Sequence, residues 1–251
     1  MIDRWRLFAN LATLGNGLLG IAAILYVLAG NKIWAMLLIV LAIALDGLDG
    51  MLSRRSRQSA RAFGRIVDSI ADAVTFGLAP AFLVAIHTTG SGPWAPWAGL
   101  SIVVAAAYVV AAVARLTYFT ARGFERPYFL GVPTPLSALA IVVVILFHDT
   151  PAFQTVAPAG VLVGTAIVAA MMVVPVPYPK IRRGNRLRVP MTVTAIAAAI
   201  TLVPLQFRPA TGTALYLLTY ASAFVLLIGV ASYYLAGPFT TPRGAVSPHS
   251  P

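Results

Sequence analysis

The chain contains no cysteine, which excludes disulfide bonds, thiolate metal ligands and cysteine nucleophiles. Charge is also scarce, because only 10% of the 251 residues are Asp, Glu, Lys or Arg, against about 25% in an ordinary soluble domain. Just seven residues are acidic. This composition excludes a soluble protein with a charged surface, and it makes the position of each acidic side chain informative.

Apolar residues take the place of the missing charges: 59% of the chain is hydrophobic and the mean hydropathy is +0.87. Stretches long enough to cross a bilayer recur throughout. The sequence therefore predicts an all-α polytopic membrane protein with about eight spans, at 10–29, 33–52, 66–87, 96–119, 134–148, 156–174, 190–206 and 214–236. The fifth is short and the seventh contains Pro204, so the pattern also fits a six-span core with two weaker C-terminal additions. We expect one integral membrane domain over 1–237 and a disordered Pro- and Ser-rich tail over 238–251.

Of the 18 Lys and Arg residues, 15 lie on one side of these spans. The opposite side receives only Lys32 and Arg208, and Arg115 lies inside a span. The positive-inside rule then predicts a protein of the cell membrane with both termini on the cytoplasmic side. This topology and attraction to anionic lipid head groups explain the net charge of +11. We therefore expect a lipid bilayer and no nucleic acid as the partner of the basic loops.

Four of the seven acidic residues, Asp46, Asp49, Asp68 and Asp72, fall within 27 positions at the ends of two apolar runs. Spacings of three and four place the members of each pair on one helix face. A turn between the two helices would bring all four carboxylates together at the cytoplasmic edge of the membrane. Such like charges repel unless a cation lies among them, and Mg²⁺ or Mn²⁺ suits oxygen ligands. Carboxylates at membrane depth are costly and mark a functional site.

Glycines and arginines surround these aspartates. Gly47, Gly50 and Gly64 permit close approach of the backbone to a ligand or to another helix. Arginines between 54 and 65, together with metal ions, would suit a pyrophosphate. Simpler interpretations remain: the arginines as topology anchors, Gly47 as a packing residue, and the aspartates as a proton or cation pathway in a transporter.

The spacing resembles the signature of the CDP-alcohol phosphotransferase family, D-x-x-D-G-x-x-A-R-x(8–9)-G-x-x-x-D-x-x-x-D. Ser53 stands where the family has alanine, and the other fixed positions match: Asp46, Asp49, Gly50, Arg54, Gly64, Asp68 and Asp72. The resemblance implies a six-span helical catalytic core that holds two Mg²⁺ or Mn²⁺ ions. It implies that Asp46, Asp49 and Asp68 bind metal, and that Asp72 is the general base and also touches a metal. The implied nucleotide site consists of Asp49, Gly50, Ser53, Arg54 and Gly64, with Thr13 and Asn16 nearby.

Four shorter segments, at 10–16, 115–120, 129–135 and 172–180, resemble the phosphatidylserine synthase branch of that family. Ala9, Tyr118 and Thr120 depart from its usual residues. This resemblance implies an enzyme that transfers the phosphatidyl group of CDP-diacylglycerol to L-serine and releases CMP. It also implies a homodimer. Arg115, Lys180 and Arg182 are the candidates for binding the acceptor.

Three alternatives stay open at this point. The acceptor could be glycerol phosphate, inositol phosphate or an archaeal lipid substrate. The chain could be an intramembrane prenyltransferase, although the two aspartate motifs of those enzymes are usually far apart in sequence. It could also be a transporter. A metal and diphosphate site does not by itself fix the reaction, but only a CDP-alcohol phosphotransferase releases CMP.

Overall fold

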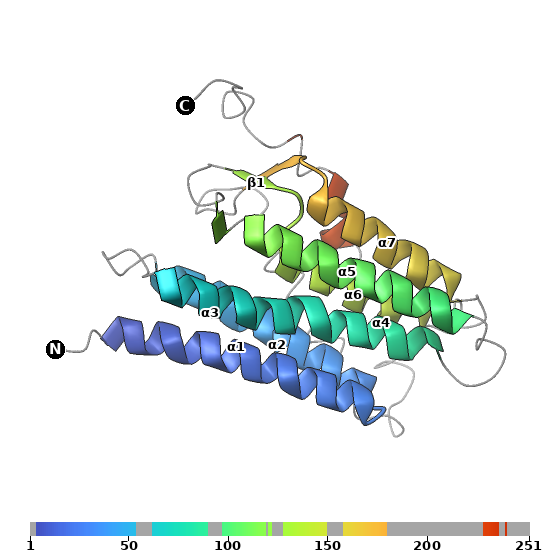
Figure 1. The fold of residues 1–251 in the computed structure, drawn as a ribbon, viewed down its shortest axis with the longest axis horizontal. Coiled ribbons are helices and arrows are strands. Elements are labelled where there is room, and N and C mark those ends of the chain that lie inside the picture. The colour runs from blue at the N-terminus through green and yellow to red at the C-terminus, as the bar shows by residue number, and fades with distance from the viewer. Residues whose placement is uncertain are drawn as a thin grey trace.

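The computed structural model describes residues 4–53, 62–89, 97–118, 120–121, 128–149, 158–179, 228–235 and 239. Helices dominate this part of the chain and run side by side along one direction (Figure 1). They are α1 (Arg4–Leu28), α2 (Lys32–Ser53), α3 (Ala62–Asp72), the π-helix η1 (Ala73–Leu78), α4 (Ala79–Thr89), α5 (Ala98–Tyr118), α6 (Thr134–His148) and α7 (Ala159–Val173). Residues 228–235 are also helical. Two short strands complete the set, β1 (Tyr128–Leu130) and β2 (Pro177–Pro179).

The predicted all-α membrane fold is confirmed. Each of the first six predicted spans corresponds to a helix, and α3, η1 and α4 follow one another without a break to form the third. The seventh span, most of the eighth and nearly all of the 238–251 tail lie outside the described residues. The domain boundary at 237 therefore stays a prediction.

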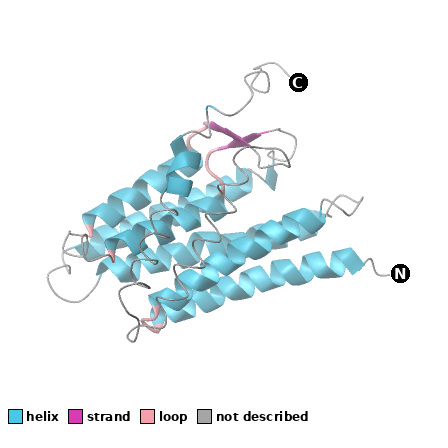
Figure 2. Ribbon diagram, turned by 180° about the vertical axis from the view of Figure 1, so that it is seen from behind, coloured by secondary structure: helices cyan, strands magenta, loops and turns pink. Residues whose placement is uncertain are grey.

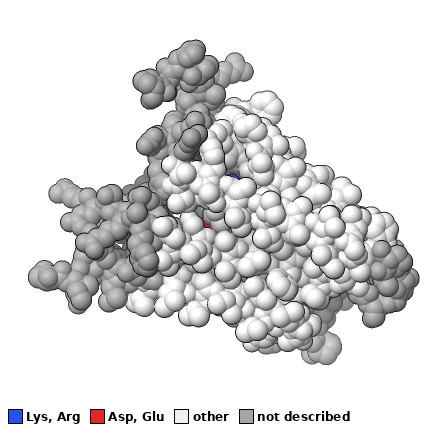
Figure 3. Space-filling model, in the orientation of Figure 1, with Lys and Arg blue, Asp and Glu red and all other residues white. Residues whose placement is uncertain are grey.

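The surface of the described part suits lipid better than water. Three helical segments there are long and apolar enough to cross a membrane, Leu11–Leu28, Ile66–Thr89 and Ala98–Tyr118, and α6 and α7 are shorter apolar helices. On α1, the exposed side chains Leu11, Leu14, Leu18, Ile21 and Leu25 recur every three or four residues and form one stripe. Figure 3 shows a face whose described part carries almost no charged side chains. The chain is an integral membrane protein.

A π-helix begins directly after Asp72. A π-turn interrupts the regular α-helical hydrogen bonding, and such turns often occur at functional sites. Neighbouring helices bond to η1: the buried Tyr108 hydroxyl donates to the Phe76 carbonyl at 2.9 Å, and the buried Thr75 hydroxyl donates to the Asn16 carbonyl at 2.8 Å. These bonds hold α5 and α1 against the segment that follows Asp72.

Glycine lets α1 approach η1 closely. A Cβ atom placed on Gly20 would lie 2.7 Å from the Cα atom of Thr75, closer than real Cβ contacts come. At Gly17 the same addition would lie 3.5 Å from the Cβ atom of Ala71, which is an ordinary contact. Position 20 therefore needs glycine for α1 to lie where it does, whereas position 17 tolerates a methyl group.

The two strands pair antiparallel at the end of the bundle where α1 and α3 begin (Figure 2). Gly131, with φ of +72°, follows β1, and its amide donates to the Val176 carbonyl at 2.9 Å. A Cβ atom there would collide with the Met172 carbonyl group. The strand pair, which the all-α prediction did not include, joins the segments 129–135 and 172–180, which are far apart in the sequence.

Candidate active site

Three aspartates from α2 and α3 lie together. One carboxylate oxygen from each of Asp46, Asp68 and Asp72 lies within 4.8 Å of the other two, and all three residues are partly buried. We call these three residues the aspartate cluster. Asp49 lies one turn further along α2, where side chains are outside the described part. Because like charges at this distance repel, a divalent cation would stabilise the cluster, and its hard oxygen donors suit Mg²⁺ or Mn²⁺ better than zinc.

Helix α1 supplies polar partners to two of these carboxylates. The Asn16 amide donates to Asp72 Oδ1 at 2.9 Å, and the Thr13 hydroxyl donates to Asp68 Oδ1 at 3.4 Å. Asn16 is only 2% exposed, and its side-chain oxygen has no hydrogen-bond partner among the described residues. The Asn16 backbone is itself bonded to Thr75. The structure thus places Thr13 and Asn16 against the aspartate cluster, and the shorter bond, from Asn16, fixes the Asp72 carboxylate.

Arg115 approaches the same region from the last turn of α5. It is 8% exposed, and its Nη1 atom donates to the Thr134 hydroxyl at 2.7 Å. Asp72 and Tyr233 are among its electrostatic neighbours. A buried arginine at membrane depth is costly without an anionic partner, and Asp72 is an acidic neighbour that could fill this role.

Three further contacts bring the remaining sequence motifs to this end of the bundle. The hydroxyl groups of Ser69 and Thr120 lie 2.6 Å apart. Tyr178 stacks on Tyr233 with ring centroids 5.4 Å apart, and its hydroxyl donates to the Tyr234 carbonyl at 3.2 Å. The tyrosine pair at 233 and 234 was not among the predicted site residues. The sequence feature that could have indicated it is two adjacent tyrosines at the end of an apolar run, because a buried tyrosine hydroxyl needs a hydrogen-bond partner.

The other predicted site residues are placed only in part. Gly64 is exposed on α3, and a Cβ atom on Gly64 or on Gly47 would meet no atom within 4 Å. Helix packing among the described residues therefore does not account for glycine at position 47 or at position 64. Gly50 and Ser53 lie on α2 without described side chains, and Arg54, Lys180 and Arg182 lie outside the described residues.

Comparison with known proteins agrees with this geometry. Residues 6–176 match the family described as CDP-alcohol phosphatidyltransferase. The CDP-diacylglycerol--serine O-phosphatidyltransferase of Bacillus subtilis is 31% identical over 174 residues, which cover 68% of this chain and 89% of the relative. The Helicobacter pylori protein of the same name is 28% identical over 180 residues, covering 70% and 73%. Archaetidylserine synthase of Methanothermobacter thermautotrophicus is 27% identical over 173 residues, covering 68% and 69%.

The matched region extends over more than half of the chain. It contains the aspartate cluster, the α1 residues that bond to it, Arg115 and the segment that forms β1. The chain belongs to the CDP-alcohol phosphatidyltransferase family.

Proposed function

We propose that this protein transfers the phosphatidyl group of CDP-diacylglycerol to L-serine and releases CMP. The observation that carries the proposal is the meeting of three carboxylates, Asp46, Asp68 and Asp72, from α2 and α3. The names of the relatives support serine as the acceptor, because the bacterial and the archaeal relatives are all named for a serine product or substrate.

The aspartates are the proposed site of two divalent ions, Mg²⁺ or Mn²⁺. Asp46, Asp49 and Asp68 would bind them, with Asp72 at the edge of the site, and the clustered carboxylate oxygens fit such ions. Bound ions would neutralise the diphosphate and stabilise the departing CMP. Gly50, Ser53, Arg54 and Gly64 would line the cytidine diphosphate. Gly64 is exposed on α3, one turn before Asp68, which supports this arrangement.

Asp72 is the proposed general base. The serine hydroxyl oxygen bonds to the phosphorus that carries diacylglycerol, the anhydride bond to CMP breaks, and the hydroxyl proton passes to the Asp72 carboxylate. Asn16 holds one oxygen of this carboxylate by its 2.9 Å bond, which leaves the other oxygen to accept the proton. The apolar helix surfaces would keep the acyl chains of the donor in the bilayer.

Arg115 is the proposed partner of the serine carboxylate. A guanidinium can bind a carboxylate through two parallel hydrogen bonds, which lysine cannot reproduce. We expect Arg115→Lys to raise the KM for serine by about 10-fold or more and to change the KM for CDP-diacylglycerol little, since a charged hydrogen bond contributes about 1.5–3 kcal/mol. Lys180→Gln and Arg182→Gln test the two competing candidates in the same assay. If Arg115→Lys lowers thermal stability and leaves both KM values unchanged, Arg115 is a structural residue that pairs with Asp72.

The reaction is tested with purified protein, Mg²⁺ or Mn²⁺, CDP-diacylglycerol and a panel of acceptors: serine, glycerol 3-phosphate and inositol phosphate. The proposal requires that, among these acceptors, serine is the one that causes CMP release. One relative is named archaetidylserine synthase, so a CDP-activated archaeal lipid is run beside CDP-diacylglycerol as a second candidate donor. CMP release with another acceptor and none with serine would contradict serine specificity. No CMP with any acceptor would contradict the transferase reaction.

The proposed topology puts both termini and the aspartate cluster in the cytoplasm. The cysteine-free chain allows a clean test with single cysteines. Arg57→Cys should react with an impermeant thiol reagent only from the cytoplasmic side, and Ser91→Cys only from the other side. The same two variants, labelled in detergent, serve as controls for reactivity. A homodimer is part of the proposal by resemblance to the family, and chemical crosslinking of the purified protein checks it.

A further inference from the structure

Two of the chain's three histidines meet at the end of the bundle opposite the aspartate cluster. His87 lies in the last turn of α4, and His148 is the last residue of α6. Asp72 and His87 belong to the same unbroken run of helix, and their separation in sequence corresponds to about 22 Å at a rise of 1.5 Å per residue. The histidines therefore have no part in the transfer reaction.

The two rings are arranged edge to face. His87 Nε2 lies 3.1 Å from His148 Nδ1, and the ring planes are 86° apart. Asp149 caps α6, and one ligand atom from each of His87, His148 and Asp149 lies within 4.8 Å of the other two. All three residues are partly buried. From the start of α2, Lys32 Nζ donates to Asp149 Oδ1 at 2.6 Å.

We propose that His87, His148 and Asp149 form a second metal site, which binds a divalent transition-metal ion of the zinc class. With Zn–N bonds of about 2.0–2.1 Å, two nitrogens on a tetrahedral ion lie about 3.4 Å apart. The observed 3.1 Å between the two nitrogens is close to that separation. Two imidazoles and one carboxylate are typical zinc ligands, and they differ from the all-oxygen donors of the aspartate cluster.

Metal binding needs a change of tautomer at one ring. The facing nitrogens of His87 and His148 cannot both accept a hydrogen bond, so one of them carries a proton when the site holds no ion. When an ion binds, that proton moves to the other nitrogen of the same ring. Both lone pairs then face the ion, and the net charge of the two imidazoles does not change.

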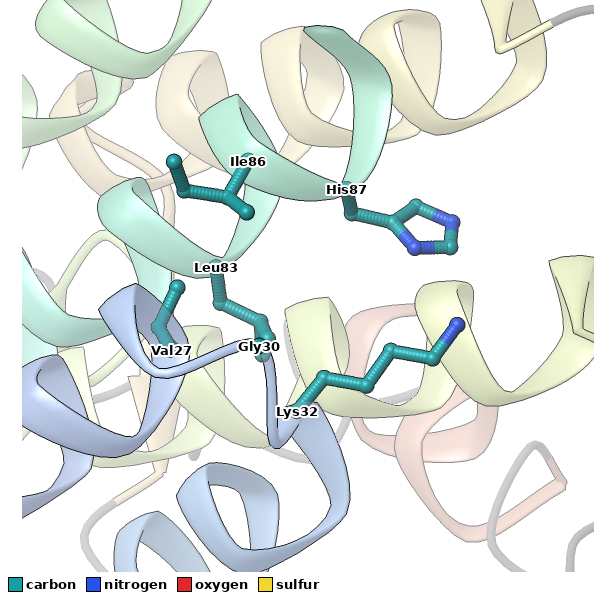
Figure 4. Close-up of a pocket in the computed structure, with 6 residues that line it drawn as sticks. All are labelled: Val27, Gly30, Lys32, Leu83, Ile86 and His87. Atoms are coloured by element: carbon teal, nitrogen blue, oxygen red, sulfur yellow. The ribbon is translucent and has the colours of Figure 1, made fainter. Parts of the chain in front are cut away.

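Space for a fourth ligand lies beside His87. A cavity of about 210 Å³ is lined there by Val27, Gly30, Lys32, Leu83, Ile86 and His87. Figure 4 shows the His87 imidazole and the Lys32 ammonium projecting to the same side of the apolar lining residues. A water molecule in this space would complete a tetrahedral set.

The charge of Lys32 distinguishes a metal site from a simple hydrogen-bonded network. Its ammonium binds the same carboxylate that would bind the ion, and its positive charge repels a cation. Removing the lysine charge should therefore strengthen metal binding. If the four side chains were only a hydrogen-bonded network that joins helix ends, removing Lys32 would weaken the network and have no such effect. A bound ion would join the ends of α4 and α6 and so stabilise the folded protein.

The test uses the full chain in detergent, purified with an affinity tag that contains no histidine, and in excess Mg²⁺ so that hard oxygen sites are filled. Co²⁺ is the spectroscopic probe, because tetrahedral Co²⁺ absorbs visible light far more strongly than octahedral Co²⁺. We expect one equivalent of Co²⁺ with strong absorption, displacement of that absorption by Zn²⁺, and a higher thermal midpoint with Zn²⁺. His87→Gln and His148→Gln should each weaken Zn²⁺ binding by at least about 10-fold and remove the absorption. His249→Gln, which changes the third histidine, should behave as the wild type does.

Lys32→Met keeps the proposal testable if the histidine variants do not fold. We expect it to bind Zn²⁺ more tightly than the wild type, and Asp149→Asn to bind it less tightly. Weak Co²⁺ absorption in the wild type would overturn the proposal. The same is true if His87→Gln retains the absorption and the rise in thermal midpoint, because the ion would then lie in the aspartate cluster. Unchanged or weaker Zn²⁺ binding by Lys32→Met would also overturn it.

Discussion

Replacing Asn16 by alanine tests whether the aspartate cluster depends on orientation by α1. The substitution removes the amide that donates to Asp72 Oδ1 at 2.9 Å and leaves the backbone carbonyl that accepts from Thr75. The position of α1 against η1 should therefore survive, while the Asp72 carboxylate loses the contact that fixes its orientation. The change acts on one hydrogen bond to a charged group.

The size of the effect follows from that bond. A hydrogen bond to a charged group contributes about 1.5–3 kcal/mol, and each 1.36 kcal/mol in the activation barrier is about 10-fold in rate. We therefore expect Asn16→Ala to lower kcat roughly 10- to 100-fold. The thermal midpoint should change little, because the buried Asn16 side-chain oxygen has no partner among the described residues and its removal offsets part of the lost bond.

The assay is CMP release at saturating CDP-diacylglycerol and varied serine, with thermal unfolding measured on the same preparation. Thr13→Val is the matched control, because its hydroxyl reaches Asp68 only at 3.4 Å, near the limit of a hydrogen bond. Its kcat should fall less than about 5-fold. An unchanged kcat in Asn16→Ala would refute the positioning role. A fall in kcat that is matched by a fall in thermal midpoint would make Asn16 a structural residue.

Three further changes test other parts of the structure. EDTA should abolish turnover and Mg²⁺ or Mn²⁺ should restore it, while Asp46→Asn should remove activity without unfolding the protein; full activity in a metal-free preparation would contradict the metal assignment. Gly20→Ala should lower the free energy of unfolding by about 1–3 kcal/mol, because its methyl group collides with η1. Gly17→Ala is the control and should be tolerated. Equal stability of the two variants would argue against the close helix contact. Tyr108→Phe should cost about 1–3 kcal/mol because it leaves a buried carbonyl of η1 without its donor, which unfolding in detergent measures.

The membrane helices could be predicted from the sequence because the bilayer imposes one strong constraint on composition. A spanning segment must be apolar over a fixed length, so the helices α1 to α5 follow from hydropathy alone. The meeting of Asp46 with Asp68 and Asp72 followed from helical spacing, since the motif fixes which face each residue occupies.

Other features depend on contacts between distant segments. Gly77 and Pro80 mark an irregular helix after Asp72, because Pro80 has no N–H group to bond the Phe76 carbonyl, but the π-turn that forms there is also held by Tyr108 and Asn16 from two other helices. The strands β1 and β2 have three residues each, and two of the three residues of β2 are prolines, so neither strand is long enough to show an alternating pattern. The histidine pair joins two helix ends 61 positions apart: Asp149 follows His148 directly, but His87 has no ligand-type neighbour in sequence, so the sequence alone does not bring the three together.

A single stoichiometric measurement decides whether this chain is the serine transferase that we propose. Purified protein is incubated with CDP-diacylglycerol, Mn²⁺ and radiolabelled serine, and both CMP and lipid-bound serine are quantified over time. We expect the two products in a ratio of one to one, with both lost in Asp72→Asn. CMP release without label in the lipid, or equal amounts of both products in Asp72→Asn and the wild type, would contradict the proposed reaction or the proposed base.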